Sequence, residues 1–231
     1  MTQLLPKVKE KITLAQFVIT GAIFLIFPIL LYIVVLVKSN KQETTVVQLV
    51  DGHSIVGENK PASYRTPEQV EEFTKEWASW TFSADGKIPG TEEEDPGRET
   101  NTGNKVTSNA WVGSFMLDTD FRQEFLDVLA EIMPAEDLIS GRLTSNLIPD
   151  FVESRQVSET TWEVTLISSI LLIDKATGVQ EERIPFNKTV TVEVTTMPSS
   201  PLGEDANTLE KVAYKMRARG LKITELLDYQ E

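Results

Sequence analysis

The sequence predicts an α+β domain carried behind a single N-terminal transmembrane helix. The run from Leu14 to Val37 holds 24 residues without a charge, and no comparable run follows it. After that run, apolar residues first recur at helical spacing and later alternate strictly, from about Leu147 onwards. Helices followed by antiparallel strands are typical of an α+β domain whose helices pack on a sheet.

The apolar run is long enough to span a membrane. At about 1.5 Å per helical residue it exceeds a bilayer core of about 30 Å. A spanning segment must satisfy its backbone hydrogen bonds internally, so we expect a helix over 14–37. The run is longer than the core of a signal peptide, and Lys38, Ser39 and Asn40 offer no small-residue cleavage site. The sequence therefore predicts an uncleaved anchor.

Charge predicts the orientation of this anchor. Three lysines precede the run and two follow it, which favours a cytoplasmic tail over 1–13 and an extracytoplasmic C-terminal domain in the inner membrane of a bacterium. The whole chain carries a net charge of -13, whereas residues 1–45 carry +3, so the remainder carries -16. Such a domain repels nucleic acid and anionic lipid, and we expect no nucleic-acid partner.

Residues 38–65 are expected to link the anchor to the domain. The segment 44–50 is rich in β-branched residues, Asp51-Gly52 is a turn pair, and 54–56 could return as a second strand. A hairpin and an extended stalk both fit. The one histidine, His53, lies beside this turn and is expected to be a turn residue.

The domain proper, residues 66–231, begins with a well-marked helix. Thr66 can cap it, Pro67 suits its first position, and Gln69 completes a capping box. One helical face then carries Val70, Phe73, Trp77 and Trp80. We expect this aromatic stripe to be part of the core, lying across a sheet.

Residues 83–110 are rich in glycine, proline, threonine and acids, and predict a mobile acidic loop. Glu92 to Asp95 lack the alternating spacing of a calcium loop and are expected to be solvated. A second helix is predicted after Asp118. Its expected inward residues are Phe121, Phe125, Val128, Leu129 and Ile132. A short helix over 135–140 follows, closed by Gly141.

Three strands are predicted next, over 151–157, over 160–173, and as one long strand across 184–194. Alternation places an inner row of side chains in the concavity of the sheet, where we expect a filled core: Trp162, Val164, Leu166, Val190 and Val192. After a loop, a helix with Leu209, Val212, Ala213 and Met216 inward is expected to end at Gly220, and residues 221–229 form a last strand.

No pattern of residues indicates catalysis. The chain has no cysteine, one histidine, no Gly-x-Ser-x-Gly elbow and no phosphate-binding glycine loop. We therefore expect a non-enzymatic protein with no catalytic, cofactor-binding or metal-binding residues and no cofactor. The anchor then becomes the main functional feature, and it indicates placement and assembly.

The layout resembles a known family. The resemblance rests on the helix VEEFTKEWASWTF, the strands TTWEVTLISSILLI and FNKTVTVEVTT, and the tripeptide Pro201-Leu202-Gly203. These parts resemble the bitopic assembly subunits of type IV secretion and conjugation systems, whose extracytoplasmic domain has the nuclear-transport-factor-2-like fold. In those proteins a similar tripeptide leads directly into the closing strand, whereas here a predicted helix stands between them.

The resemblance implies a structural role. Such subunits form dimers or higher oligomers through the soluble domain and help to assemble an envelope-spanning channel, so the expected partners are the membrane, further copies of the chain and other subunits. Two alternatives stay open. The chain could serve another membrane complex, respiratory, photosynthetic or of an injection machine. Alternatively, the concavity of the sheet could bind a small ligand.

Overall fold

The computed structural model describes Ile29, Tyr32 and residues 45–48, 54–57, 60–203 and 205–230. The chain divides into two compact units, Met1–Pro61 and Ala62–Glu231. The predicted cytoplasmic tail and, apart from Ile29 and Tyr32, the predicted transmembrane helix over 14–37 lie outside the described residues. Within the part of the chain that is described, no helix has the length and apolarity needed to cross a bilayer.

The described part of the first unit contains a β-hairpin. β1 (Thr45–Gln48) and β2 (Ser54–Gly57) pair antiparallel, with Thr45 opposite Gly57. Of the two forms that the sequence allowed for the linker, the hairpin is therefore the one present. The turn that contains His53 lies outside the described residues.

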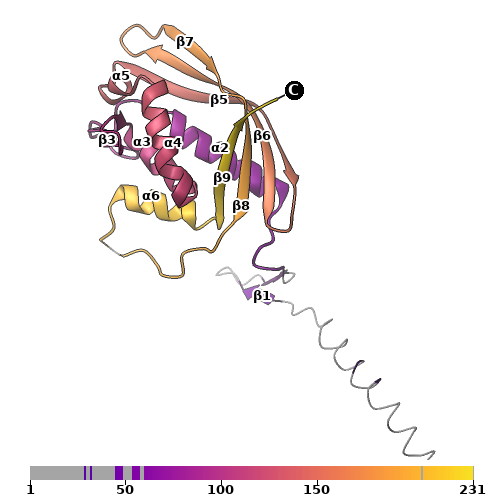
Figure 1. Ribbon diagram of the computed structural model, residues 1–231. Helices are drawn as coiled ribbons and strands as arrows, with labels where there is room; N and C mark the ends of the chain where they lie inside the picture. The colour runs from indigo at the N-terminus through magenta and orange to yellow at the C-terminus, as the bar shows by residue number, and fades with distance from the viewer. Residues whose placement is uncertain are drawn as a thin grey trace, which may run out of the picture. The chain divides into compact units, whose positions relative to one another are not determined.

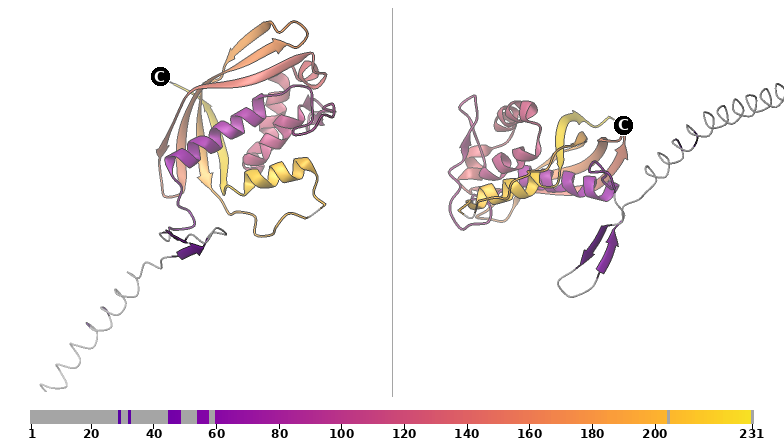
Figure 2. Two further views of the ribbon diagram at one scale, coloured as in Figure 1. Left: turned by 180° about the vertical axis from the view of Figure 1, so that it is seen from behind. Right: turned by 90° about the horizontal axis from the view of Figure 1, so that it is seen from below.

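The second unit is built on an antiparallel sheet, to which the described residues contribute five strands (Figure 1). Four of them lie in the order β5-β6-β8-β9, and β7 pairs with β6 at the same edge as β8. The strands are β5 (Leu143–Gln156), β6 (Thr161–Asp174), β7 (Gln180–Pro185), β8 (Lys188–Val194) and β9 (Leu221–Asp228). The sheet curves, and its helices lie on the concave side (Figure 2). The predicted α+β class, with helices packed on an antiparallel sheet, is confirmed.

The helical part of this unit lies between residues 67 and 139, with one further helix near the C-terminus. Its elements are α2 (Pro67–Phe82), α3 (Ser108–Gly113), the 3-10 turn η1 (Ser114–Met116), α4 (Thr119–Ile132), α5 (Ala135–Ile139) and α6 (Thr208–Arg217). A two-stranded ribbon, β3 (Arg98–Glu99) with β4 (Lys105–Val106), precedes α3.

The helix α2 lies across the concave side of the sheet, mainly against β5 (Figure 2, left). Its start is as predicted: Thr66 accepts a hydrogen bond from the Gln69 backbone, and the Gln69 side chain accepts one from the Thr66 backbone. Phe73 and Trp77 are fully buried, and Trp77 meets the ring of Phe125 of α4 at 5.9 Å between centroids. The aromatic stripe is thus part of the core, as predicted, with Trp80 half-buried at its end.

The inner row of the sheet is also confirmed. Trp162 is opposite Val192 and Val164 is opposite Val190 in the register of β6 and β8. All five side chains predicted to line the concavity are buried: Trp162, Val164, Leu166, Val190 and Val192. This burial stabilises each aliphatic side chain by about 1.5–3 kcal/mol relative to an exposed position.

The single strand predicted across 184–194 is wrong, because the chain breaks there into β7 and β8. Both strands pair with the same edge of β6, one after the other. Ser168 of β6 fixes the break: its hydroxyl donates to the Phe186 carbonyl at 2.6 Å, and its backbone N–H donates to the Asn187 side chain at 3.3 Å. The break redirects β7 away from β8, which widens the sheet at that end (Figure 1).

The first strand starts earlier than predicted. β5 begins at Leu143, eight residues before the predicted start at 151. The missed part contains Pro149 and Asp150, which disfavour a central strand. They are tolerated because β5 is at the edge of the sheet and a bulge between Pro149 and Phe151 absorbs the irregularity.

The predicted inner face of α4 is wrong in part. Phe125 and Leu129 are buried as expected, but Val128 and Ile132 are 50% and 64% exposed. Leu126 is buried instead. At 3.6 residues per turn, the packed face lies roughly a quarter turn from the predicted one.

The C-terminal elements agree with the prediction. α6 has a capping box between Asn207 and Glu210, buries Met216, and is followed by Gly220 at a φ of +65°. β9 then completes the sheet beside β8. The short helix predicted over 135–140 is present as α5.

Candidate functional site

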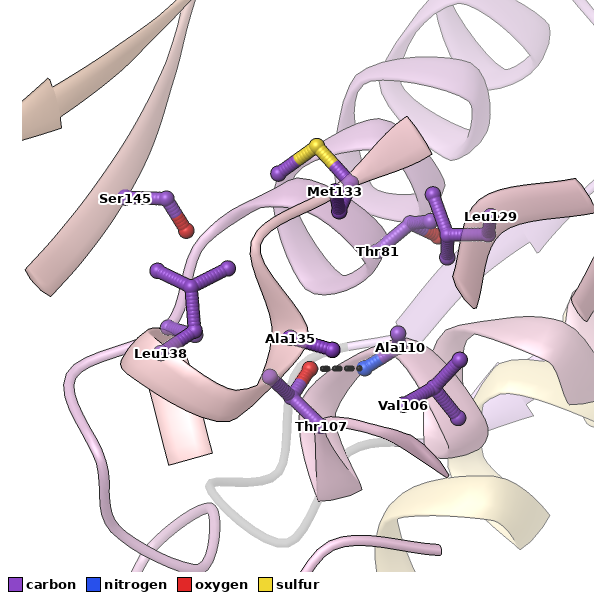
Figure 3. A pocket seen from close by; sticks show the side chains of 10 residues that line it. Thr81, Val106, Thr107, Ala110, Leu129, Met133, Ala135, Leu138 and Ser145 are labelled. Atoms are coloured by element: carbon purple, nitrogen blue, oxygen red, sulfur yellow. Dashed lines mark hydrogen bonds between the residues drawn. The ribbon is translucent and has the colours of Figure 1, made fainter. Parts of the chain in front are cut away.

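The concave side of the sheet is filled by side chains of α2, α3 and α4 rather than open. One small void of about 10 Å³ is left beneath α2, lined by Thr81, Leu129, Leu138 and Ser145 among others (Figure 3). The hydroxyls of Thr81 and Ser145 are both buried there without a hydrogen-bond partner. A void of this size fits one water molecule, so at this place the fold has no room for a small ligand.

The acidic segment does not gather its carboxylates into one site. Asp95 is buried, and accepts hydrogen bonds from the Ser108 backbone at 2.7 Å, the Ser108 hydroxyl at 2.6 Å and the Gly97 backbone at 2.9 Å. Glu92 is exposed and pairs with Lys87. Asp95 therefore organises the turn before α3 instead of being solvated, while the mobility of 83–110 stays a prediction. Among the described residues, no group of three or more potential ligands is arranged to hold a metal ion.

Two hollows lie beside α6, which packs against α3 and η1 (Figure 1). A cleft of about 550 Å³ is lined by residues of β3, α3, η1, α6 and the loop before α6: Arg98, Trp111, Phe115, Pro198, Leu202, Asn207, Leu209, Glu210, Ala213, Tyr214 and Arg217. We call it the arginine cleft. A second hollow of about 570 Å³ shares Phe115, Pro198 and Arg217 with it and extends to Lys222.

Two aromatic rings and Arg98 line the arginine cleft, and a second arginine, Arg122, contacts the Phe115 ring without lining the cleft. Trp111 and Phe115 meet edge to face at 4.7 Å between ring centroids. The guanidinium of Arg98 lies 5.1 Å from the Trp111 ring centroid, and that of Arg122 of α4 lies 5.0 Å from the Phe115 ring centroid. Trp111 and Phe115 are four residues apart in the continuous segment of α3 and η1, whereas Arg98 of β3 and Arg122 of α4 are brought to them by the tertiary fold.

Some charged side chains around the cleft are paired with an opposite charge, and others are not. Burial lowers the pKa of the Arg122 guanidinium, and the positive charge of Arg217 lowers it further. By contrast, Lys222 donates to Asp118 at 2.6 Å, and this bond holds the pKa of the Asp118 carboxyl below its usual range. The Asp118–Lys222 pair ties the start of α4 to β9 and leaves Lys222 engaged.

The loop between β8 and α6 forms the outer side of the cleft. Tyr214 of α6 donates a hydrogen bond to the Ser200 carbonyl at 3.1 Å, which fastens the loop to the helix. Pro198 and Leu202 of that loop line the cleft. The helix that the sequence predicted between Pro201-Leu202-Gly203 and the last strand is therefore the element that creates this hollow.

Comparison with known proteins identifies similar solved structures only. No family model and no curated protein matches the chain. An IcmL-like type IV secretion system protein from Legionella pneumophila is similar with a TM-score of 0.47 and 10% identity, over 71% of this chain and 91% of that one. The soluble domain of TrwG of the type IV secretion machinery from Bartonella grahamii has the same score and identity, with 94% of its chain covered.

CagV from Helicobacter pylori, described as a VirB8 homolog of a type IV secretion system, is similar with a TM-score of 0.40 and 11% identity, over 71% of this chain and 99% of that one. These similar structures are of type IV secretion proteins, the kind of protein that the sequence also resembles.

Proposed function

We propose that this chain is a non-enzymatic, membrane-anchored assembly subunit of a type IV secretion or conjugation channel. In this proposal, residues 1–13 are a cytoplasmic tail and residues 14–37 span the inner membrane. Residues 38–65 link this span to the extracytoplasmic domain, which residues 66–231 form. The domain acts by self-association and by contacts with other subunits.

The filled concavity of the sheet is the observation that carries this proposal. A domain of this architecture can bind a small ligand in the concavity of its sheet, or it can bind partner proteins by its outer surfaces. Here apolar side chains of α2 and β6 occupy the concavity, with Phe73, Trp77 and Val164 fully buried. The surfaces and the clefts at the rim are then the parts that remain for binding.

The apolar run over 14–37 supports the anchored part of the proposal, because it has the length of a spanning helix and lysines on both sides. An anchor confines the domains to two dimensions and raises their effective concentration, so weak contacts suffice for assembly. Catalysis is not part of the proposal, since the sequence has no cysteine, one histidine and no Gly-x-Ser-x-Gly elbow.

Fractionation and partner identification test this function. The full chain should sediment with membranes and resist carbonate extraction, and a variant lacking residues 1–45 should not. Added protease should digest the large domain only from the extracytoplasmic side; digestion from the cytoplasmic side would reverse the proposed orientation.

Co-purification from detergent-solubilised membranes then identifies the complex, with the variant lacking residues 1–45 as the matched control. Subunits of a secretion channel, together with a second tagged copy of the chain, are the expected partners. Recovery of respiratory, photosynthetic or injection-machine subunits alone would reject the secretion channel in favour of another membrane complex.

A further inference from the structure

Three arginines around the arginine cleft have no carboxylate partner. Of the arginines in the described residues, four pair with acids: Arg142, Arg155, Arg183 and Arg219. Arg65 donates to backbone carbonyls. Arg98, Arg122 and Arg217 make neither kind of contact in the described part of the chain, although the chain after residue 45 carries a net charge of -16. Their lack of partners therefore does not come from a shortage of acids.

The fold keeps this positive charge at a cost. The Nε atoms of Arg98 and Arg122 are buried and have no hydrogen-bond partner. An unpaired buried donor and a desolvated charge are both unfavourable. Arg122 lies on the packed face of α4, and the like charge of Arg217 acts on it unfavourably. The binding of an anion would offset the unfavourable energy of the unpaired donors and of the desolvated positive charge.

The two acids that line the cleft and the neighbouring hollow are engaged by other groups. Glu210 lines the cleft, but its carboxylate accepts a hydrogen bond from the Asn207 backbone at 2.9 Å in the capping box of α6. Asp118 lines the neighbouring hollow and is engaged by Lys222. Arg98 and Arg217 are therefore the cationic groups that line the cleft, beside the one engaged carboxylate of Glu210.

The remaining lining is apolar and aromatic. The guanidinium groups of Arg98 and Arg122 lie 5.1 Å and 5.0 Å from the ring centroids of Trp111 and Phe115, a cation–π contact that requires no carboxylate. Leu202 and Tyr214 add apolar surface on the opposite side. A site that combines arginines, a tryptophan and a tyrosine has the composition of an interface hot spot. Its ligand should carry both carboxylates and apolar side chains.

We propose that the arginine cleft binds an acidic peptide segment of a partner protein, with carboxylates on Arg98 and Arg217 and an apolar side chain against Trp111. A short segment fits a cleft of about 550 Å³. An extended polyanion, such as a nucleic acid or a membrane surface, would meet the net negative charge of the rest of the domain. The proposal rests on the proposed function only in taking the ligand to be a protein.

Peptide binding to the purified full chain in detergent tests the proposal. The probe is a short fluorescein-labelled peptide in which glutamates alternate with leucine and phenylalanine, followed by fluorescence anisotropy. The same peptide with glutamines is the matched ligand control. The glutamate peptide should bind and the glutamine peptide should not, and added salt should weaken binding because the contacts are ionic.

Two double variants that remove equal charge locate the site. Arg98→Gln with Arg217→Gln should weaken binding by about tenfold or more, since each change removes a charge-assisted contact. Arg155→Gln with Arg183→Gln lies on β5 and β7, outside the cleft, and should bind as the unaltered chain does. Circular dichroism of both variants checks that the fold is kept.

Three results would overturn the proposal: no binding of the glutamate peptide, equal loss in the two double variants, or displacement of the peptide by inorganic phosphate or phosphatidylglycerol vesicles at lower charge concentration than the peptide itself. The last result would assign the cleft to phosphate groups. Because the assay uses one purified protein, a failure here leaves the membrane and co-purification tests of the assembly function unaffected.

Discussion

Asp95 is an acid with a structural role, whereas the acids directly before it are exposed to solvent. It follows three exposed glutamates, yet its carboxylate is buried and accepts three hydrogen bonds from Gly97 and Ser108. Asp95→Asn should lower the free energy of unfolding by about 1–3 kcal/mol, because an amide NH₂ group would face a backbone donor. Urea denaturation followed by circular dichroism measures the loss.

Glu94→Gln is the matched control for this change, since Glu94 is the exposed neighbour and also loses a charge. It should leave the urea midpoint almost unchanged. Equal effects of the two substitutions would mean that net charge, rather than the hydrogen bonds of Asp95, determines the result.

The Asp118–Lys222 pair predicts a pH-dependent stability. The hydrogen bond from Lys222 lowers the pKa of Asp118, so the pair stabilises the folded state at pH values above the unfolded pKa of about 3.9. The contribution is lost as the pH falls through the lower, folded pKa. Asp118→Asn can still cap α4, and should therefore be less stable than the unaltered chain at neutral pH.

Urea midpoints of the two proteins, measured from pH 7 down to pH 2, test this pair. The difference between them should be constant down to about pH 4 and then shrink towards zero. A difference that stays the same at low pH would show that the lost charge is not its cause.

Residue spacing could predict some of these contacts and not others. The capping box of Thr66 and Gln69 is local, so three residues of sequence suffice to recognise it. The arginine cleft joins Arg98, Trp111 and Arg217, which only the tertiary fold brings together. The composition shows how many arginines and acids the chain contains. It does not show which arginines remain unpaired in the fold.

At the scale of the element, the turn after α6 depends on a glycine. Gly220 has a φ of +65°, and an added Cβ would lie 2.9 Å from Met197 Cγ and 3.2 Å from the Thr195 carbonyl oxygen. Gly220→Ala should therefore destabilise the domain by about 1–3 kcal/mol, from backbone strain together with crowding. Thermal unfolding measures the change.

Gly103→Ala separates the two causes, because Gly103 also has a positive φ, +81°, but no atom within 4 Å of an added Cβ. It should show the cost of the backbone conformation alone, and so a smaller decrease in the melting temperature. A larger decrease for Gly103→Ala than for Gly220→Ala would contradict the packing described around α6.

Periodicity predicted which elements exist better than how they pack. For α4 the heptad-like spacing fits two overlapping stripes that share Phe125 and Leu129, and only the position of α2 decides between them. For β7 and β8 a local signal is present, since Pro185 and Asn187 disfavour one continuous strand. Ser168 of the neighbouring strand then hydrogen-bonds Phe186 and Asn187 at the break.

At the scale of the whole molecule, the domain should fold without the N-terminal part of the chain. Residues 62–231 form a compact unit with their own apolar core. Removing residues 1–61 should therefore change the free energy of unfolding by no more than about 1 kcal/mol, within the range of changes that leave a core intact. Urea denaturation of both forms, the full chain in detergent, provides the comparison.

A fragment with broad, uncooperative unfolding would show that the division at residue 61 is not a folding boundary. The same fragment bears on the anchored function, because it should be soluble and monodisperse at low concentration. Sedimentation of the fragment and of the full chain then separates association through the domain from association that needs the anchor.

The hydrogen bonds between α2 and β5 have a consequence for how copies of the domain can meet. The outward N–H groups of Ser145, Leu147 and Ser154 donate to Ala84, Ser83 and Glu71. At the opposite edge, the Ile223 carbonyl of β9 accepts from the Asp118 backbone at 2.7 Å. These bonds occupy positions where a foreign strand would add to the sheet. In the assembly proposed above, copies of the domain would then meet by faces and side chains rather than by strand addition at these positions.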